Sequence, residues 1–306
     1  MHKRDFLAAG LGLGAGLAAS AALAPVLGQG APAAPAAGRG AAGGDGPGAV
    51  KTVRAKTTRM FRAPDFYPNA LAVAPEGLWI GQQKLSINMS RVWGMPLPVN
   101  RDEAAWLVDW NGKLLRTVIA PSRNCSGIAW GGGHLWMASN EAPTGIFQLE
   151  PNGKVIRERQ IPLALEAWGG GCHGLQWHHG KLWIASLRLG GALRVDPVTW
   201  VPEVLIPVAS QEKPRLHDLT FDANGDMWVV TGNNAPLYAD ARPGLNKYDG
   251  KTGQLVMTVD IEPGGADPHG LAFYNGKLIS CDAGSHPGWR ENESPHSGWI
   301  FSIDFV

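Results

Sequence analysis

The sequence predicts an all-β fold, a β-propeller of five four-stranded blades in which an N-terminal strand closes the last blade. A two-strand unit occurs five times in the 306 residues. The Leu or Met that opens each second strand lies at positions 78, 135, 182, 227 and 278, so the unit returns every 45 to 57 residues. Repeats of about 40–50 residues made of short strands are typical of propellers.

The clearest copy of the unit spans residues 172–186. Leu175 and Trp177 alternate with small or polar neighbours, as in a half-buried strand, and His179-Gly180-Lys181 predicts a turn before a second, apolar strand. Four of the thirteen Trp occupy one equivalent position in the second strands, where we expect them to wedge between blades: Trp79, Trp136, Trp183 and Trp228.

A strand-like segment at 53–61 precedes the first unit, and the fifth unit ends one strand short, after 299–303. The simplest closure is that the early strand completes the last blade. The connections between second and third strands are long at 82–103, 232–243 and 283–297. In a propeller these connections lie on one rim, which predicts a site there.

The N-terminus has the pattern of an export signal over residues 1–28: a basic start, an apolar run, and small residues near Ala22-Leu23-Ala24. Lys3-Arg4-Asp5-Phe6-Leu7 is similar to the twin-arginine motif, with Lys3 in place of the first Arg, so both folded export and general secretion stay open. An uncleaved anchor is the alternative, although the run is Gly-rich and only weakly apolar.

Residues 29–50 consist largely of Ala, Gly and Pro and predict a linker, so the propeller domain is expected at 51–306. We expect a periplasmic or secreted protein with no stable membrane span after processing. Lys and Arg total 27 against 26 Asp and Glu, a net charge of +1. Without a basic excess, no nucleic-acid partner is predicted.

Three His stand at one repeat position. The first residues of the five innermost strands are Asn69, Ser126, His173, His217 and His269. Because the repeat places them equivalently, all five should converge at the mouth of the channel. Three neutral imidazoles directed at one axis predict a metal site, with hydrogen bonding between blades or a wet channel as the alternative.

Asp282 ends the second strand of the last unit, so it is predicted as a fourth metal ligand and a catalytic acid or base. Asp218, beside His217, is a candidate second-shell carboxylate or base. His269 is the other catalytic candidate. Three His with one carboxylate suit Zn, Fe, Mn or Ni, and they do not exclude Cu. They disfavour Ca²⁺, which prefers oxygen ligands.

The remaining positions on this rim predict residues that contact a small-molecule substrate: Asn69, Ser126, Gln82, Ser139, Ser186 and Thr231. His178 and His179 fall in a turn on the opposite face, where solvation is expected. His286 and His296 lie in the last long loop and are candidates to cover the site. Cys125 and Cys172 share one register in adjacent blades, so a disulfide or two free thiols are both open.

Pro268-His269-Gly270-Leu271-Ala272-Phe273, and Cys172-His173-Gly174-Leu175, resemble the repeat of the streptogramin (virginiamycin B) lyase family, and more broadly the gluconolactonase-type propellers. The resemblance implies divalent-metal chemistry at His269, and more weakly at His173 and His217, with Asp282 in the place of an acidic residue. In the lactonase-type relatives this strand position carries Asn and Asp ligands, which Asn69 matches. The lyase has seven blades and a Glu at the acidic place, so this chain departs from it.

The strands around Gly180-Lys181-Leu182-Trp183 are also similar to those of bacterial glutaminyl cyclotransferases, whose substrate-binding segments are not matched; only Glu166 and Trp168 could supply the carboxylate-and-Trp pocket that such an enzyme needs. The leading hypothesis is an exported metal-dependent lyase or hydrolase acting on a small cyclic ester. The alternative is a non-catalytic propeller that binds a ligand or protein and has a structural histidine cluster.

Overall fold

The computed structural model describes residues 50–84, 90, 94, 102–141, 144–163, 172–187, 189–208, 216–231, 243–284 and 295–306. The predicted export signal at 1–28 and all of the linker except Val50 lie outside these residues. So do Glu166, Trp168 and His286. The described residues contain no helix that is long and apolar enough to cross a membrane.

The described elements are twenty β-strands, which confirms the predicted all-β architecture of four-stranded sheets. Three sheets are antiparallel meanders of four consecutive strands. The first contains β2 (Pro68–Ala74), β3 (Gly77–Gln82), β4 (Ala104–Val108) and β5 (Leu114–Ile119). The second contains β6 (Gly127–Gly131), β7 (His134–Ser139), β8 (Gly145–Leu149) and β9 (Val155–Arg159). The third contains β10 (Cys172–His178), β11 (Lys181–Ser186), β12 (Gly191–Val195) and β13 (Pro202–Pro207).

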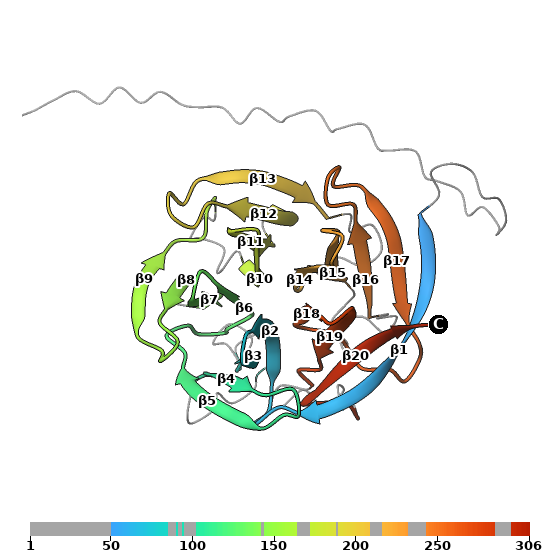
Figure 1. Ribbon diagram of the computed structural model, residues 1–306, viewed down its shortest axis with the longest axis horizontal. Helices are drawn as coiled ribbons and strands as arrows, with labels where there is room; N and C mark the ends of the chain where they lie inside the picture. The colour runs from blue at the N-terminus through green and yellow to red at the C-terminus, as the bar shows by residue number, and fades with distance from the viewer. Residues whose placement is uncertain are drawn as a thin grey trace, which may run out of the picture. The chain divides into compact units, whose positions relative to one another are not determined.

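The fourth sheet has eight strands, in the order β14-β15-β16-β17-β1-β20-β19-β18. One half of it contains β14 (Leu219–Phe221), β15 (Met227–Thr231), β16 (Gly244–Tyr248) and β17 (Leu255–Ile261). The other half contains β18 (Leu271–Tyr274), β19 (Lys277–Cys281), β20 (Trp299–Phe305) and the N-terminal strand β1 (Lys51–Arg62). In Figure 1, β2, β6, β10, β14 and β18 lie innermost.

The strand β1 pairs in antiparallel fashion with β20 from Ala55 to Arg62, as expected for an N-terminal strand that completes the last repeat. Its first residues, Lys51 to Ala55, also pair in parallel with β17, which the repeats did not predict. A strand of 12 residues is long enough to reach both partners. This second pairing joins two four-stranded groups into one sheet.

The hydrophobic core lies between the sheets. Five clusters of buried side chains each draw residues from two four-stranded groups that are neighbours. The predicted Trp wedges are confirmed. Trp79 stacks on Trp130 with ring centroids 6.4 Å apart, and Trp136 stacks on Trp177 with centroids 5.8 Å apart. The ring of Trp183 is tilted against that of Phe221, with centroids 5.0 Å apart. Each pair crosses from one sheet to the next.

At three glycine positions the innermost strands approach one another so closely that a Cβ does not fit between them. A Cβ on Gly127 would lie 2.3 Å from the carbonyl oxygen of His173, and one on Gly174 would lie 2.0 Å from a carboxylate oxygen of Asp218. A Cβ on Gly270 would lie 2.7 Å from Cα of Ala70. Gly127, Gly174 and Gly270, which follow Ser126, His173 and His269, therefore have no side chain because their neighbours leave no room for one.

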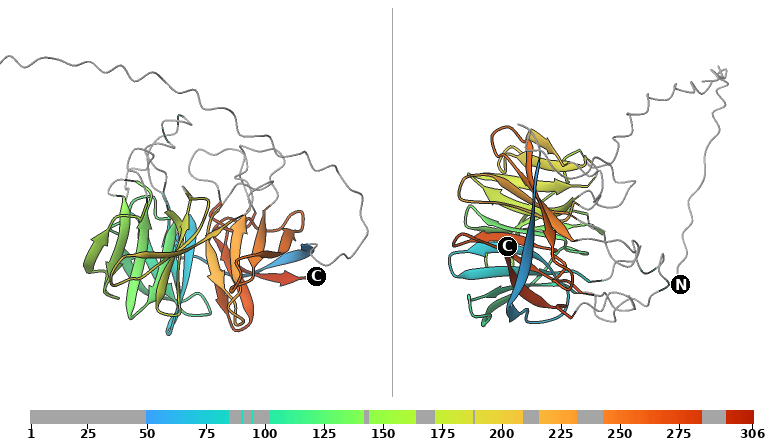
Figure 2. Two further views of the ribbon diagram at one scale, coloured as in Figure 1. Left: turned by 90° about the horizontal axis from the view of Figure 1, so that it is seen from above. Right: turned by 90° about the vertical axis from the view of Figure 1, so that its right-hand side faces the viewer.

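All sheets have strands running between the same two ends of the unit, as the side views in Figure 2 show. At one end lie the first residues of the inner strands, including His173. At the other end lie the tight turns that join inner and second strands, such as His179-Gly180, with φ of 49° and 73°. Positive φ at both positions is typical of type I′ hairpins. We call the first the histidine end and the second the turn end.

Candidate functional site

The structure brings together the three His predicted to converge. Ring centroids of His173 and His217 are 3.9 Å apart, and those of His217 and His269 are 4.6 Å apart, the latter edge to face. His217 and His269 are 3% and 7% exposed. These three residues, which we call the histidine cluster, come from β10 and from the segments that lead into β14 and β18.

The local backbone explains how the cluster forms. The pairing of β10 with β11 is irregular between Cys172 and Leu175, and that of β2 with β3 between Pro68 and Ala70. Such bulges redirect a side chain. They fall at His173 and Asn69. His217 and His269 precede their strands rather than opening them, although their backbone N–H groups still donate to the carbonyl oxygens of Val230 and Cys281.

The arrangement of the rings does not fit a shared metal ion. Two imidazoles that bind one tetrahedral ion at about 2.1 Å have ring centres roughly 5 Å apart. The 3.9 Å separation of His173 and His217 is shorter, so these rings pack on each other. Within the described part of the chain, no group of three or more His, Cys, Asp or Glu could hold a metal ion. The metal site at His173, His217, His269 and Asp282 therefore stays a prediction that this geometry does not support.

Asp282 acts on His269 through the backbone. The Asp282 carboxylate accepts hydrogen bonds from the N–H groups of Asp267 (3.1 Å) and Gly284 (2.8 Å). The carbonyl oxygen of Asp267 lies 3.1 Å from Nδ1 of His269. Because a carbonyl only accepts, Nδ1 carries the proton in this bond, and the lone pair of the neutral ring is on Nε2. Asp282 and Asp267 thus orient His269, and sequence reasoning missed Asp267.

Asp218 is buried between two inner strands rather than presented to a ligand. Its two carboxylate oxygens accept hydrogen bonds from the N–H groups of Leu219 and Leu271, each at 2.8 Å. Burial raises the pKa of Asp218 well above its usual value. The contact with Leu271 ties β14 to β18. A role as proton acceptor is not supported by this position.

Three of the six predicted rim residues, Gln82, Ser139 and Ser186, are hydrogen-bonded to the backbone of neighbouring segments. The Gln82 amide donates to the carbonyl oxygen of Phe66 and accepts from the N–H of Ala104. Ser139 donates to the carbonyl oxygen of Glu141 (2.6 Å), and Ser186 accepts from Leu189 N–H at 3.4 Å. Since backbone groups occupy these side chains, their position on the rim does not make them ligand contacts.

Ser126 is bound by other side chains. Its hydroxyl accepts hydrogen bonds at 2.9 Å from the amide nitrogens of Gln83 and Asn140, and donates to the carbonyl oxygen of Asn124. The Gln83 amide also donates to the Asn124 side chain. Three side-chain amides and one hydroxyl thus form a polar network, of which only Ser126 was predicted.

Asn69 and Thr231 differ from the other rim residues. Both are fully buried, at 0% exposure. Within the described residues, neither the amide atoms of Asn69 nor the hydroxyl of Thr231 has a hydrogen-bond partner. Buried polar groups are almost always hydrogen-bonded, so these atoms are the rim groups best suited to a water molecule or ligand.

Glu103 is a functional-site neighbour that the sequence did not single out. Its buried carboxylate accepts hydrogen bonds from the N–H groups of Lys84, Asn124 and Cys125, at 2.8, 3.0 and 2.7 Å. Burial nevertheless raises its pKa to about 7. Glu103 ties the end of the first sheet to the segment that carries Ser126, and no local motif marks it.

The cysteines are free and buried, so the open alternative of a Cys125–Cys172 disulfide is not realised. The thiol of Cys125 instead donates to the carbonyl oxygen of Gly127, and that of Cys172 to the carbonyl oxygen of Gly174. His296 accepts a hydrogen bond from Nε of Arg59 and lies 3.0 Å from the carbonyl oxygen of Gly264, so it connects the segment before β20 to β1 and to the turn after β17.

Several solved structures align with this chain at low sequence identity. The glutaminyl cyclase of Myxococcus xanthus aligns with a TM-score of 0.54 at 14% identity, covering 84% of this chain and 100% of that chain. A putative oxidoreductase (glucose dehydrogenase) of Thermus thermophilus aligns with a TM-score of 0.45 at 15% identity, covering 81% and 99%. The WD40 repeats of RRP9 align with a TM-score of 0.47 at 11% identity, covering 78% and 79%. No protein-family model matches the chain, and no curated protein matches it.

Proposed function

We propose that this chain is a five-bladed β-propeller enzyme that hydrolyses, or eliminates from, a small ester or lactone at the histidine cluster. The count of five is supported by the two four-stranded halves of the large sheet, added to the three separate sheets. It is also supported by the five hydrophobic clusters between neighbouring groups of strands in the described core.

The observation that carries the proposed activity is the convergence of three imidazoles from three consecutive four-stranded groups. Imidazole is the side chain most often used to move protons near neutral pH. Two such rings in contact supply both a base and an acid. Ester hydrolysis and elimination each need this pair, because one proton is removed while another is delivered to the departing oxygen.

His269 is the better candidate for the base. Its Nδ1 bond to Asp267 orients the ring and leaves the lone pair on Nε2. In hydrolysis, Nε2 would take a proton from water as the water oxygen attacks the carbonyl carbon. In elimination, it would take the proton from the carbon beside the carbonyl. His217, in contact with His269, would in its protonated form return a proton to the leaving oxygen. The Asn69 amide, whose atoms have no hydrogen-bond partner among the described residues, would hydrogen-bond the substrate.

A divalent metal (Zn, Fe, Mn or Ni) at the cluster is a separate hypothesis. It requires His173 and His217 to separate from their present 3.9 Å ring contact, and no step above depends on it. Export to the periplasm or beyond, directed by residues 1–28, is likewise proposed from the sequence alone. Metal content of the purified protein and N-terminal sequencing of the mature chain test these two points.

The same ring contacts favour one second candidate, a non-catalytic propeller in which the histidine cluster is a packing element and the rim binds a ligand. In that case, removal of an imidazole lowers stability and changes no reaction rate.

The deciding experiment compares the wild type with His217→Asn and His269→Asn on 4-nitrophenyl acetate and on γ- and δ-lactones, following acid release and alkene formation. We expect turnover by the wild type and a loss of about 100-fold or more in each variant. His179→Asn is the matched control, because His179 is exposed at the turn end and its φ of 49° suits Asn. Equal rates in all four proteins, or no turnover by any, would contradict the enzyme proposal.

A further inference from the structure

A second polar region lies at the turn end, away from the histidine cluster. A cleft of about 810 Å³ opens between the sheet β10–β13 and the strands β14–β17. Its walls include His178, Trp183, Arg194, Phe221 and Lys251. His178 and His173 stand five residues apart at opposite ends of β10, so the cleft is separate from the proposed active site. Its volume is in the range of small-molecule sites.

The acidic groups of the cleft are already hydrogen-bonded within the protein. Glu203 accepts from Lys181 at 2.5 Å through one oxygen and from Nε of Arg194 at 3.0 Å through the other. Asp226 pairs with Lys247 at 2.7 Å. Asp249 accepts from the N–H groups of its own turn, which hold its pKa below the usual value. The carboxylates are therefore poor partners for a cation.

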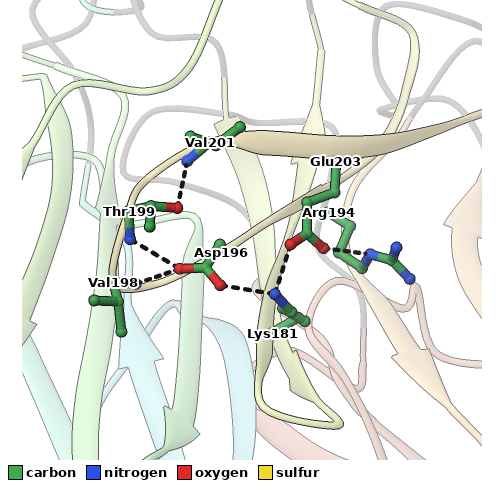
Figure 3. Close-up of polar contacts among 7 residues, drawn as sticks. All are labelled: Lys181, Arg194, Asp196, Val198, Thr199, Val201 and Glu203. Atoms are coloured by element: carbon green, nitrogen blue, oxygen red, sulfur yellow. Dashed lines mark hydrogen bonds and ion pairs between the residues drawn. The ribbon is translucent and has the colours of Figure 1, made fainter.

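Arg194 is the basic group with donors to spare. Its Nε is bound to Glu203, and its guanidinium lies over the Trp183 ring at 5.8 Å. Figure 3 shows the two terminal nitrogens pointing away from Glu203. Within the described residues these nitrogens make no hydrogen bond that would compete with a ligand. A guanidinium held in this way presents two parallel N–H groups, the geometry that matches a carboxylate or phosphate.

A flat aromatic wall lines the same cleft as this guanidinium. The ring of His178 stacks on Phe221 with centroids 4.1 Å apart and planes 11° apart. Burial, and secondarily His179, lower the pKa of His178 to about 4. The ring is therefore neutral at physiological pH, and the wall is apolar as well as flat.

We propose that the cleft binds a small aromatic oxyanion, with its carboxylate or phosphate group on Arg194 and its ring against His178 and Phe221. Lys251, on the facing wall, adds a second positive charge. The ion pairs that Lys181 and Arg194 make with Glu203 hold the guanidinium in place before the ligand arrives, so little side-chain entropy is lost on binding.

Titration calorimetry of the purified protein with benzoate, phenyl phosphate and inorganic phosphate tests this proposal. We expect saturable binding of at least one aromatic probe, with inorganic phosphate weaker. Arg194→Gln and Arg194→Lys should each weaken binding by about tenfold or more, because neither can form the two parallel bonds. Arg157→Gln, an exposed Arg on β9, is the matched control and should bind as the wild type does.

His178→Ala should weaken the aromatic probes and leave inorganic phosphate unchanged, which distinguishes the wall from the guanidinium. Thermal unfolding of each variant establishes that it is folded. No saturable binding of any probe at millimolar concentration overturns the proposal. So does full affinity in Arg194→Lys, or equal affinity for phenyl phosphate and inorganic phosphate. Because binding is measured directly, the outcome does not depend on the activity of the histidine cluster.

Discussion

The two halves of the histidine end start from the same repeat position and end in different roles. On the side of β2 and β6, which we call the amide half, Ser126 and Gln82 are bound to neighbouring side chains and loops. On the side of β10, β14 and β18, which we call the imidazole half, the rings of His173, His217 and His269 contact one another. The difference teaches that a repeat determines where a side chain is placed, whereas its partners determine what it does.

Two carboxylates within the imidazole half show the same contrast. Asp218 accepts from the backbone of two inner strands and joins the two halves of the eight-stranded sheet. Asp282 accepts from the backbone of the loop that orients His269. Both were candidates for proton transfer, yet backbone donors occupy both. The Nε2 lone pair of the neutral His269 ring is the better proton acceptor.

The largest effect should come from the one feature that both halves share, the close approach of the inner strands. Gly127→Ala and Gly174→Ala should each lower the free energy of unfolding by about 3 kcal/mol, because the new Cβ meets fixed backbone below 3.0 Å. Gly81→Ala, whose Cβ would find its nearest atom at 3.3 Å, is the control and should cost about 1 kcal/mol or less. Chemical denaturation measures all three. Similar values for the three variants would mean that the inner strands are not tightly packed.

The next effect concerns the amide half and depends on pH. Burial raises the pKa of Glu103 to about 7, so ionisation costs more in the folded protein than in the unfolded chain. The contribution of Glu103 to stability is therefore greatest at low pH, and it falls as the pH rises through about 7, by about 3 kcal/mol in all. Relative to Glu103→Gln, the free energy of unfolding of the wild type should decline between about pH 4 and pH 8. If the difference in free energy of unfolding between the wild type and Glu103→Gln did not change with pH, the raised pKa of Glu103 would be contradicted.

The smallest effect distinguishes a residue that positions His269 from a residue that only stabilises the fold. Asp282→Asn should reduce kcat of the proposed reaction by about tenfold, because the loop that orients His269 loses part of its anchor. Gln82→Ala removes an equally buried anchor from the amide half. It should lower the free energy of unfolding by about 1–2 kcal/mol and leave kcat unchanged. Paired kinetics and denaturation measure both variants, and a loss of activity in Gln82→Ala would remove the distinction between the halves.

The sequence by itself determined the strands and the positions that converge. Alternating apolar residues and Gly-containing turns recur at a nearly constant interval, so the inner strands, the Trp wedges and the three His could be placed without coordinates. These features follow from local geometry, because a strand directs every second side chain to one face. The pairing of β1 with β20 also followed from a repeat that lacked a strand.

The tertiary structure alone decided which groups each polar side chain meets. Asp218 and Leu271 lie 53 residues apart in sequence, and Glu103 accepts from a segment about 20 residues away, distances over which no motif specifies a contact. The parallel pairing of β1 with β17, the free thiols and the Arg194 cleft are of the same kind. They depend on the separation and relative orientation of neighbouring sheets, which are set by the packing of the whole core between them.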